Sequence, residues 1–232
     1  MRELEFGAPK EDFHAALLDW FESEKRDFPW RRTRDPFKIL IAERLLQQTR
    51  ATPAVVSAYK RLVRRYPTPA RLATAQLSDL EHIIQPLGLL FRAKQLRRMA
   101  NELVDRHSGG VPCSYGELME LTGVGEYCAS AVLSFAFGED AAVVDTNVGR
   151  FLYRLFDISQ PFPANPSRTK WLHKAATALL PPGRSRAFNL AVLDLCAKVC
   201  APSHPTCGVC PVHGFCRHAP PQSPAASSRD DQ

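Results

Sequence analysis

Leu121-Thr122-Gly123-Val124-Gly125-Glu126-Tyr127-Cys128-Ala129 (LTGVGEYCA) is the stretch that decides the fold. A helical pattern over 115–121 precedes the glycines, and a second one over 126–137 follows them and ends at Gly138. Two glycines around Val124 allow the backbone to turn tightly between two helices. Free amides of such a turn, together with the positive end of the second helix dipole, favour a bound phosphate. The stretch predicts a helix-hairpin-helix that grips a DNA backbone, although glycine-containing helical hairpins without a ligand are also common.

The rest of the chain also follows a helical pattern. Apolar residues at helical spacing favour helices over 13–24, 39–48, 54–65, 70–75, 77–85, 92–107, 169–180 and 185–199, with a further one after Asp145. No convincing alternating strand pattern is present, so we expect an all-α fold. Residues 159–166 form a proline-rich loop in this interpretation. We expect the tail from Ala219 to be disordered, because it has almost no bulky apolar residues.

Composition narrows the class of protein. The chain has 232 residues, of which 45% are hydrophobic and 23% charged, as is typical of a globular protein in water. No run approaches the roughly 18 apolar residues of a membrane helix, and the first residues lack the apolar core of a secretory signal. We therefore expect a cytoplasmic protein. A net charge of +6 suits a polyanionic partner, but a basic surface without any partner has the same charge.

Seven cysteines are present, and four of them, Cys200, Cys207, Cys210 and Cys216, lie within a short C-terminal segment. An odd number without an export signal argues against disulfides and for a metal or cluster site. The spacing contains one C-x2-C pair, whereas zinc ribbons usually have two, and by itself it does not separate zinc from an iron–sulfur cluster. Cys128 and Cys196 lie in apolar helical patterns and are interpreted as buried free thiols.

The hairpin is followed by Val143-Val144-Asp145-Thr146-Asn147-Val148-Gly149-Arg150 (VVDTNVGR). Together the two motifs resemble the signature of the endonuclease III and MutY superfamily of DNA glycosylases. The resemblance runs from about Phe28 to Cys216 and includes FPWRRTRDPF at 28–37, LIAERLLQQT at 40–49 and the cysteine spacing. Within the superfamily the chain is most similar to Mig-type thymine–guanine mismatch glycosylases, with MutY-type adenine glycosylases next.

This resemblance implies two helical lobes with the DNA and the active-site cleft between them. Residues 28–138 would form a six-helix barrel with the helix-hairpin-helix, and residues 1–27 plus 139–218 an iron–sulfur domain. The four C-terminal cysteines would bind a structural [4Fe–4S] cluster. The partner would be double-stranded DNA with a mispaired or damaged base, bound by a monomer near the nucleoid of a prokaryotic cell, with no membrane involved.

Asp145 matches the family's catalytic aspartate, whose charge stabilises the cationic sugar of the transition state. Without that context, an aspartate ahead of a helix is more often an N-cap. Asn147 matches a residue that helps to fix the aspartate and the sugar. Tyr127 stands where bifunctional relatives have a lysine that forms a Schiff base, and a phenol cannot do so. The resemblance therefore implies a monofunctional enzyme that uses water, although Tyr127 could also be a surface aromatic.

Glu43 matches the glutamate that MutY-type enzymes use to protonate the leaving adenine, whereas an ordinary exposed glutamate is the simpler interpretation. Base flipping also needs side chains that fill the gap left in the base stack. Gln47 and Gln48 match the pair that MutY-type enzymes carry there, while Leu89 and Leu90 occupy the second wedge loop. Backbone contact with the DNA is assigned by the resemblance to the hairpin residues Gly123, Val124 and Gly125.

Three functions remain open from the sequence. The first is a monofunctional glycosylase that removes thymine or uracil opposite guanine. The second is a MutY-type adenine glycosylase that lacks the 8-oxoguanine-recognition domain, because only a short segment follows Cys216. The third is a non-catalytic DNA-binding module that reuses the hairpin, which the presence of both Asp145 and Glu43 disfavours.

Overall fold

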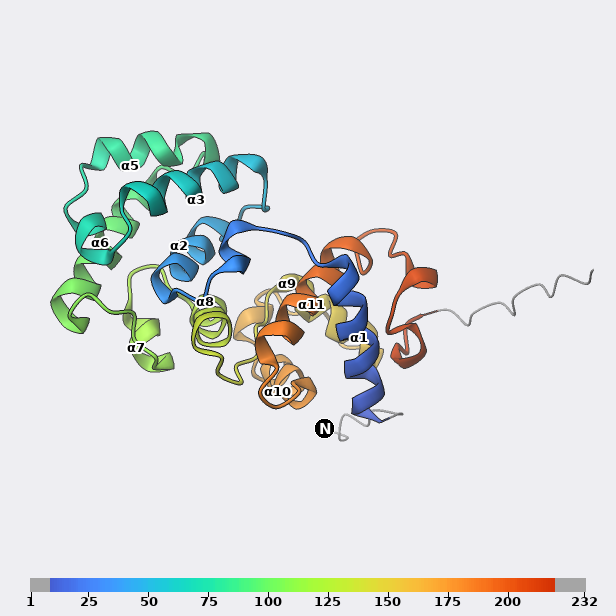
Figure 1. The fold of residues 1–232 in the computed structure, drawn as a ribbon. Coiled ribbons are helices and arrows are strands. Elements are labelled where there is room, and N and C mark those ends of the chain that lie inside the picture. Colours follow the sequence, from blue (N-terminus) through green and yellow to red (C-terminus); the bar gives the residue numbers. More distant parts are fainter. Residues whose placement is uncertain (1–8, 220–232) are drawn as a thin grey trace, which may run out of the picture.

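The structure, a computed structural model, describes residues 9–219, and these residues contain helices and no strand (Figure 1). The all-α expectation is confirmed. The α-helices are α1 (Lys10–Glu24), α2 (Pro36–Leu46), α3 (Pro53–Arg65), α4 (Pro69–Ala73), α5 (Leu77–Ile84), α6 (Phe91–His107), α7 (Tyr115–Glu120), α8 (Glu126–Val132), α9 (Thr146–Phe156), α10 (Lys170–Leu179) and α11 (Ser185–Lys198). None of these helices is long and apolar enough to cross a lipid bilayer.

Helices gather in two groups on either side of the molecule (Figure 1). One group contains α2 to α8, in which α4 packs on α6 and α2 contacts both α3 and α8. The other contains α9, α10 and α11 together with α1, which packs along α11 although the two lie at opposite ends of the sequence. The expected domain limits at 28–138 and 139–218 stay a prediction, because the buried apolar residues form one continuous cluster.

Local sequence explains where several helices begin. Asp35, Thr52 and Thr68 each cap a helix with a side-chain oxygen, and a proline follows each of them as the first helical residue. Such a cap satisfies amides that the helix leaves free, and proline has no amide to satisfy. The capping by Asp35 fixes the start of α2, which carries Glu43 into the interior.

Several helices end earlier than the pattern predicted, and α2 and α8 show how this occurs. The α2 helix ends at Leu46 instead of residue 48, and Gln47 has already left helical geometry. Likewise α8 ends at Val132, after which Leu133–Phe137 form a π-helical turn. Gly138 closes that turn with a φ of +78°, the left-handed conformation that glycine adopts without strain.

The cysteines outside the C-terminal group differ in burial. Cys128 and Cys196 are buried free thiols, as predicted, whereas Cys113 is exposed. The tail expected to be disordered lies outside the described residues, apart from Ala219.

Candidate active site

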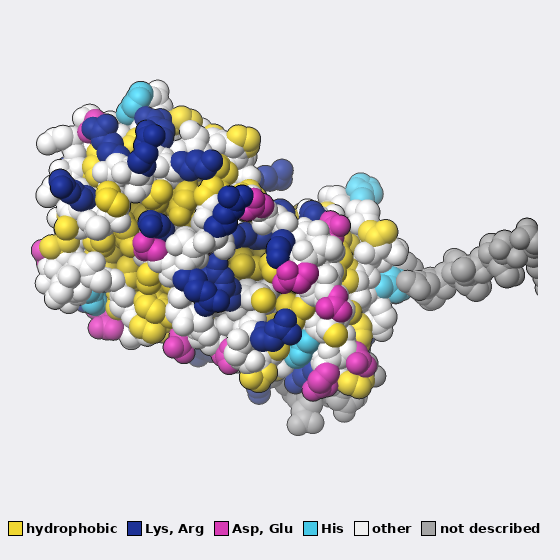
Figure 2. Space-filling model, in the orientation of Figure 1, with side chains coloured by type: hydrophobic (Ala, Val, Ile, Leu, Met, Phe, Trp, Pro, Cys, Tyr) yellow, Lys and Arg dark blue, Asp and Glu magenta, His cyan; other side chains and the backbone are white. Residues whose placement is uncertain are grey.

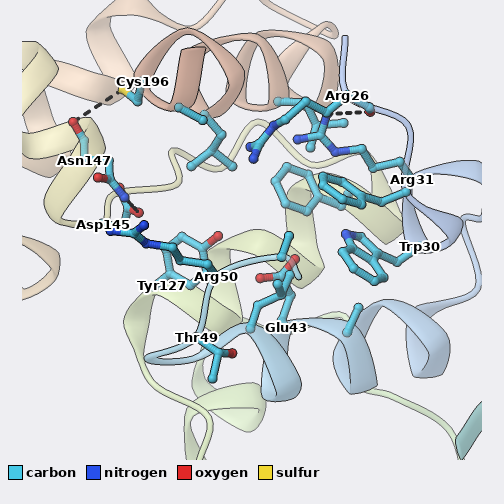
Figure 3. Close-up of a pocket in the computed structure, with 18 of the residues that line it drawn as sticks. Arg26, Trp30, Arg31, Glu43, Thr49, Arg50, Tyr127, Asp145, Asn147 and Cys196 are labelled. Atoms are coloured by element: carbon cyan, nitrogen blue, oxygen red, sulfur yellow. Dashed lines mark hydrogen bonds between the residues drawn. The ribbon is translucent and has the colours of Figure 1, made fainter. Parts of the chain in front are cut away.

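A cavity of about 540 Å³ opens between the two groups of helices. Its lining combines side chains from α2, α8, the segment before α9, α11 and the connection between α1 and α2. Figure 3 shows Asp145 and Asn147 on one side, Arg26 and Arg31 on the other, and Tyr127 and Glu43 between them. Three residues that the sequence predicted as catalytic therefore share one cavity, although the first and last of them, Glu43 and Asp145, are 102 positions apart.

Glu43 lies on the inner face of α2, where only 4% of it is exposed. Its Oε2 atom is buried and has no hydrogen-bond partner among the described residues. The pKa of this carboxyl is raised to about 7, mainly by burial. The hydrogen bond from Tyr127 and the charge of Arg31 oppose this rise, whereas the charge of Asp145 adds to it. Glu43 is therefore not an ordinary surface glutamate. Near neutral pH about half of this carboxyl is therefore in the neutral form, which can donate a proton.

Tyr127 stands in the first turn of α8, directly after the hairpin. Burial raises the pKa of the phenol well above its usual value, and the charges of Glu43 and Asp145 raise it further. The hydroxyl consequently stays protonated and faces the acid on α2. Among the described residues that line the cavity, none is a lysine.

Asp145 caps α9, and it does so with one oxygen only. Its Oδ1 accepts a hydrogen bond from the amide of Val148 at 2.7 Å, while Oδ2 accepts one from the Asn147 side chain at 2.8 Å. The N-cap interpretation is thus confirmed, and the same carboxylate lines the cavity, while its catalytic role stays a prediction. The cap fixes the carboxylate in orientation at the edge of the cavity.

The opposite wall depends on residues that the sequence analysis missed. Arg26 and Arg31 both donate to Asp194 on α11, with distances from 2.5 to 2.8 Å. Asp194 is fully buried, and this burial alone would raise its pKa. The hydrogen bonds and the charge of Arg31, together with hydrogen bonds from Arg26, outweigh burial and bring the pKa below its usual value. Phe28 stacks on Trp30 beside this group, with ring centroids 4.9 Å apart. The signal available in the sequence was a lone aspartate inside the apolar helix FNLAVLDL.

Arg50 is a further lining residue without an earlier assignment. Its side chain extends from the loop after α2 into the cavity and toward Asp145 in Figure 3. No hydrogen bond or ion pair joins this side chain to the described residues, so its cation is available to a ligand.

Gly123, Val124 and Gly125 form the turn between α7 and α8. Gly123 adopts a φ of +78°, and a Cβ atom there would come within 2.2 Å of the Arg44 guanidinium. That guanidinium is almost fully buried and donates to the Gly123 carbonyl, to Gln47 and to Gln95.

Gln47 and Gln48 point in different directions. The Gln47 side chain donates to the Gly123 carbonyl at 3.1 Å and accepts from Arg44, which directs it toward the hairpin. Gln48 is exposed and has a φ of +56°. In the second predicted wedge loop, Leu90 is 47% exposed, whereas Leu89 is partly buried. Next to it, Phe91 is 53% exposed.

All four C-terminal cysteines lie in the loop after α11, and each is partly buried. They influence one another electrostatically: burial raises the pKa of Cys210 to about 11, and the other three thiols contribute to that rise. Arg154 donates to the Cys200 sulfur at 3.3 Å. Within the described chain, no group of three or more histidine, cysteine or acidic side chains is close enough to bind a single metal ion.

Comparison with known proteins gives consistent results. The profile of HhH-GPD superfamily base excision DNA repair proteins matches residues 41–172. A thymine/uracil-DNA glycosylase of Pyrobaculum aerophilum is 39% identical over 204 residues, which cover 86% of this chain and 88% of that protein. Human adenine DNA glycosylase is 36% identical over 88% of this chain but only 39% of its own length. The solved structure of a thermostable thymine-DNA glycosylase superposes with a TM-score of 0.83 at 35% identity, covering 90% of this chain and 95% of that one.

Proposed function

Because the chain belongs to the HhH-GPD superfamily of base excision DNA repair proteins, we propose that it hydrolyses mispaired thymine or uracil from DNA. It is a DNA glycosylase, a hydrolase of N-glycosyl bonds. The observation that carries the specific proposal is one cavity lined by Asp145, Tyr127 and a Glu43 that stays partly protonated near neutral pH, with no lysine among its described lining residues.

In the proposed reaction the mispaired nucleotide leaves the base stack and enters the cavity. As the bond between C1′ and the base nitrogen breaks, its electron pair goes to the base and positive charge develops on the sugar. The Asp145 carboxylate stabilises that charge and orients a water molecule. The water oxygen bonds to C1′, and the Asp145 carboxylate takes up the proton that the water loses. The products are a free base and an intact abasic site.

A departing thymine or uracil carries negative charge that spreads from the ring nitrogen onto its carbonyl oxygens. Glu43 is suited to donate its proton to such an oxygen, since burial keeps much of it protonated near pH 7. The cations of Arg26 and Arg31 on the opposite wall favour the same anion. Tyr127 cannot form a Schiff base, so we propose that strand cleavage does not accompany base release.

A second candidate is adenine removal, as in the MutY-type alternative. It is favoured by the neutral Glu43, because a proton donor of this kind could equally protonate a purine nitrogen. Arginines beside the leaving base disfavour it, since a protonated purine is a cation. The non-catalytic alternative does not agree with this group of side chains.

One panel of duplexes tests these assignments. Oligonucleotides with T:G, U:G, A:G, A:8-oxoguanine and oxidised pyrimidines would each be incubated with the protein and analysed with and without alkali. We expect alkali-dependent nicking of T:G and U:G. Preferential cleavage at A:8-oxoguanine would support the second candidate, and nicking without alkali would contradict the monofunctional proposal.

We further propose that DNA is bound as a double strand by a monomer in the cytoplasm. The hairpin amides around Gly123, Val124 and Gly125 would hold backbone phosphates. Gln48 and Leu90, which are exposed on adjacent loops, would fill the gap left by the flipped base. Gln47 and Leu89, also predicted to contact DNA, would instead support these loops.

The four C-terminal cysteines fit a [4Fe–4S] cluster, which we propose as a structural cofactor. Four thiols on one loop supply the donor set, and the guanidinium of Arg154 beside the Cys200 sulfur suits a thiolate. The absence of a single-ion site among the described residues agrees with this proposal. Thiolates on four different irons lie farther apart than thiolates around one zinc ion.

Purified protein should therefore absorb broadly near roughly 400 nm and contain about four iron atoms per chain. Cys210→Ser should reduce the iron content and the unfolding temperature, whereas Cys113→Ser, an exposed cysteine outside the loop, should change neither. Stoichiometric zinc without iron in protein prepared without oxygen would contradict this proposal.

A further inference from the structure

A second hollow, of about 490 Å³, lies on the other side of the segment that carries Arg26 and Arg31. That segment is a shared wall, because Arg26, Arg31 and Arg186 line both hollows, whereas Glu43, Tyr127 and Asp145 line only the reaction cavity. We call the second hollow the basic pocket. It is formed by residues 25–34 and by the start of α11, and its size falls within the roughly 300–1,000 Å³ range of ligand pockets.

The charge of the basic pocket is strongly unbalanced. Seven of its twelve lining residues are lysine or arginine, and Asp27 is the acidic one among them. Figure 2 shows lysine and arginine side chains gathered near the middle of one face, where the two groups of helices meet. Arg32 is paired with Asp27, and Arg26 and Arg31 share the single carboxylate of Asp194.

Three arginines of the pocket have no acidic partner. The exposed side chains of Arg34 and Arg184 make no hydrogen bond or ion pair with the described residues. Arg186 donates only to backbone carbonyls, those of Phe135, Arg31 and Thr33, and these acceptors carry no net charge. Burial lowers the pKa of Arg186, and the charges of Arg34 and Arg31 lower it further. The guanidinium groups of Arg34 and Arg186 thus repel one another, and neither has an acidic partner among the described residues.

We propose that the basic pocket is a phosphate-binding site, separate from the reaction cavity, in which Arg186, Arg34 and Arg184 hold the anion. Guanidinium groups bind phosphate oxygens in pairs of hydrogen bonds, and a doubly charged tetrahedral anion can engage several of them at once. Arg186 is held in place by its three carbonyl acceptors, while Arg34 and Arg184 are free to turn toward a ligand. The phosphate belongs either to a DNA backbone outside the reaction cavity or to a free phosphate.

The experiment compares two double variants of the full-length protein. Arg34→Gln/Arg184→Gln removes two charges from the basic pocket. Arg64→Gln/Arg71→Gln removes the same number of charges from exposed, unpaired arginines on α3 and α4. Unfolding temperature would be measured in sodium phosphate and in sodium chloride at equal ionic strength. Affinity for an undamaged duplex would be measured as a function of salt.

Wild type and the α3–α4 control should unfold at a higher temperature in phosphate than in chloride, and the pocket variant should lose that difference. If DNA is the source of the phosphate, the DNA affinity of the pocket variant should also depend less steeply on salt. The slope of log affinity against log salt concentration should be smaller by about one per lost contact, and this reduction should exceed that of the control. An unchanged salt slope with loss of the phosphate effect would identify free phosphate. Equal behaviour of all three proteins in both measurements would overturn the proposal.

Discussion

The guanidinium of Arg44, on α2, donates a hydrogen bond to the carbonyl oxygen of Gly123, in the turn of the hairpin. This contact connects the helix that carries Glu43 to the loop that we propose holds the DNA backbone. It also fills the space next to Gly123, because a Cβ atom at this position would lie 2.2 Å from the guanidinium.

Gly123→Ala should therefore destabilise the protein by two effects. A positive φ costs a non-glycine residue about 1–2 kcal/mol, and the collision with Arg44 adds to this. In an Arg44→Met background the collision is reduced, so the cost of Gly123→Ala should fall by about 1 kcal/mol or more. Urea unfolding of the four proteins in this cycle measures the coupling, and strictly additive effects would argue against the contact.

Glu43→Gln should change how stability depends on pH. In the unfolded chain this carboxyl has its ordinary pKa of 4.5, whereas burial in the folded protein raises its pKa to about 7. Between these values the folded state binds more protons, so this group makes the free energy of unfolding fall as pH rises. Above pH 7 this effect should have lowered the free energy of unfolding by about 3 kcal/mol in total.

Glutamine cannot ionise, so the stability of Glu43→Gln relative to wild type should rise across the same pH interval. Urea midpoints measured for both proteins from acid to neutral pH provide the test. Wild-type base release should also slow as pH rises through about 7, because the proposed donor loses its proton. A parallel pH dependence of the two midpoints would show that folding does not raise the pKa of Glu43.

Asp145→Asn should slow base release by about a hundredfold or more while DNA binding stays within a few-fold of wild type. Asparagine is also a good N-cap, so α9 should still begin at Thr146, but the negative charge that stabilises the transition state is lost. Single-turnover excision and a binding titration separate the two effects. Asp157→Asn, at the other end of α9, is the matched control and should leave excision unchanged.

Tyr127→Lys should introduce strand cleavage. The new amine would stand in the first turn of α8 beside the cavity, and burial would lower its pKa so that part of it is neutral. Borohydride should then trap a covalent complex between this variant and the mismatched duplex. Tyr127→Phe, which adds no amine, should not be trapped. Efficient trapping of wild type would mean that another lysine reaches the sugar.

The sequence was sufficient to predict the features that depend on residues near one another in the chain, such as the helices and the hairpin. The helices were predicted from apolar spacing and the hairpin from its glycines, because both signals act over a few residues. The predicted start of α2 at residue 39 was three residues late, since it took no account of the Asp35 cap and Pro36. The direction of Gln47 was not predictable, since it depends on a carbonyl that lies 76 positions away. Similarly, nothing near Arg26 or Arg31 in the sequence indicates that both arginines bind Asp194.

The distance along the chain between those arginines and Asp194 has a consequence for biosynthesis. Arg31 and Asp194 are separated by 163 positions, so the arginines leave the ribosome long before their carboxylate is translated. A nascent chain that ended before α11 would contain Glu43, Tyr127 and Asp145 but would lack the acid that fixes one wall of the cavity. Catalytic competence would therefore arise late in translation, when α11 packs against α1.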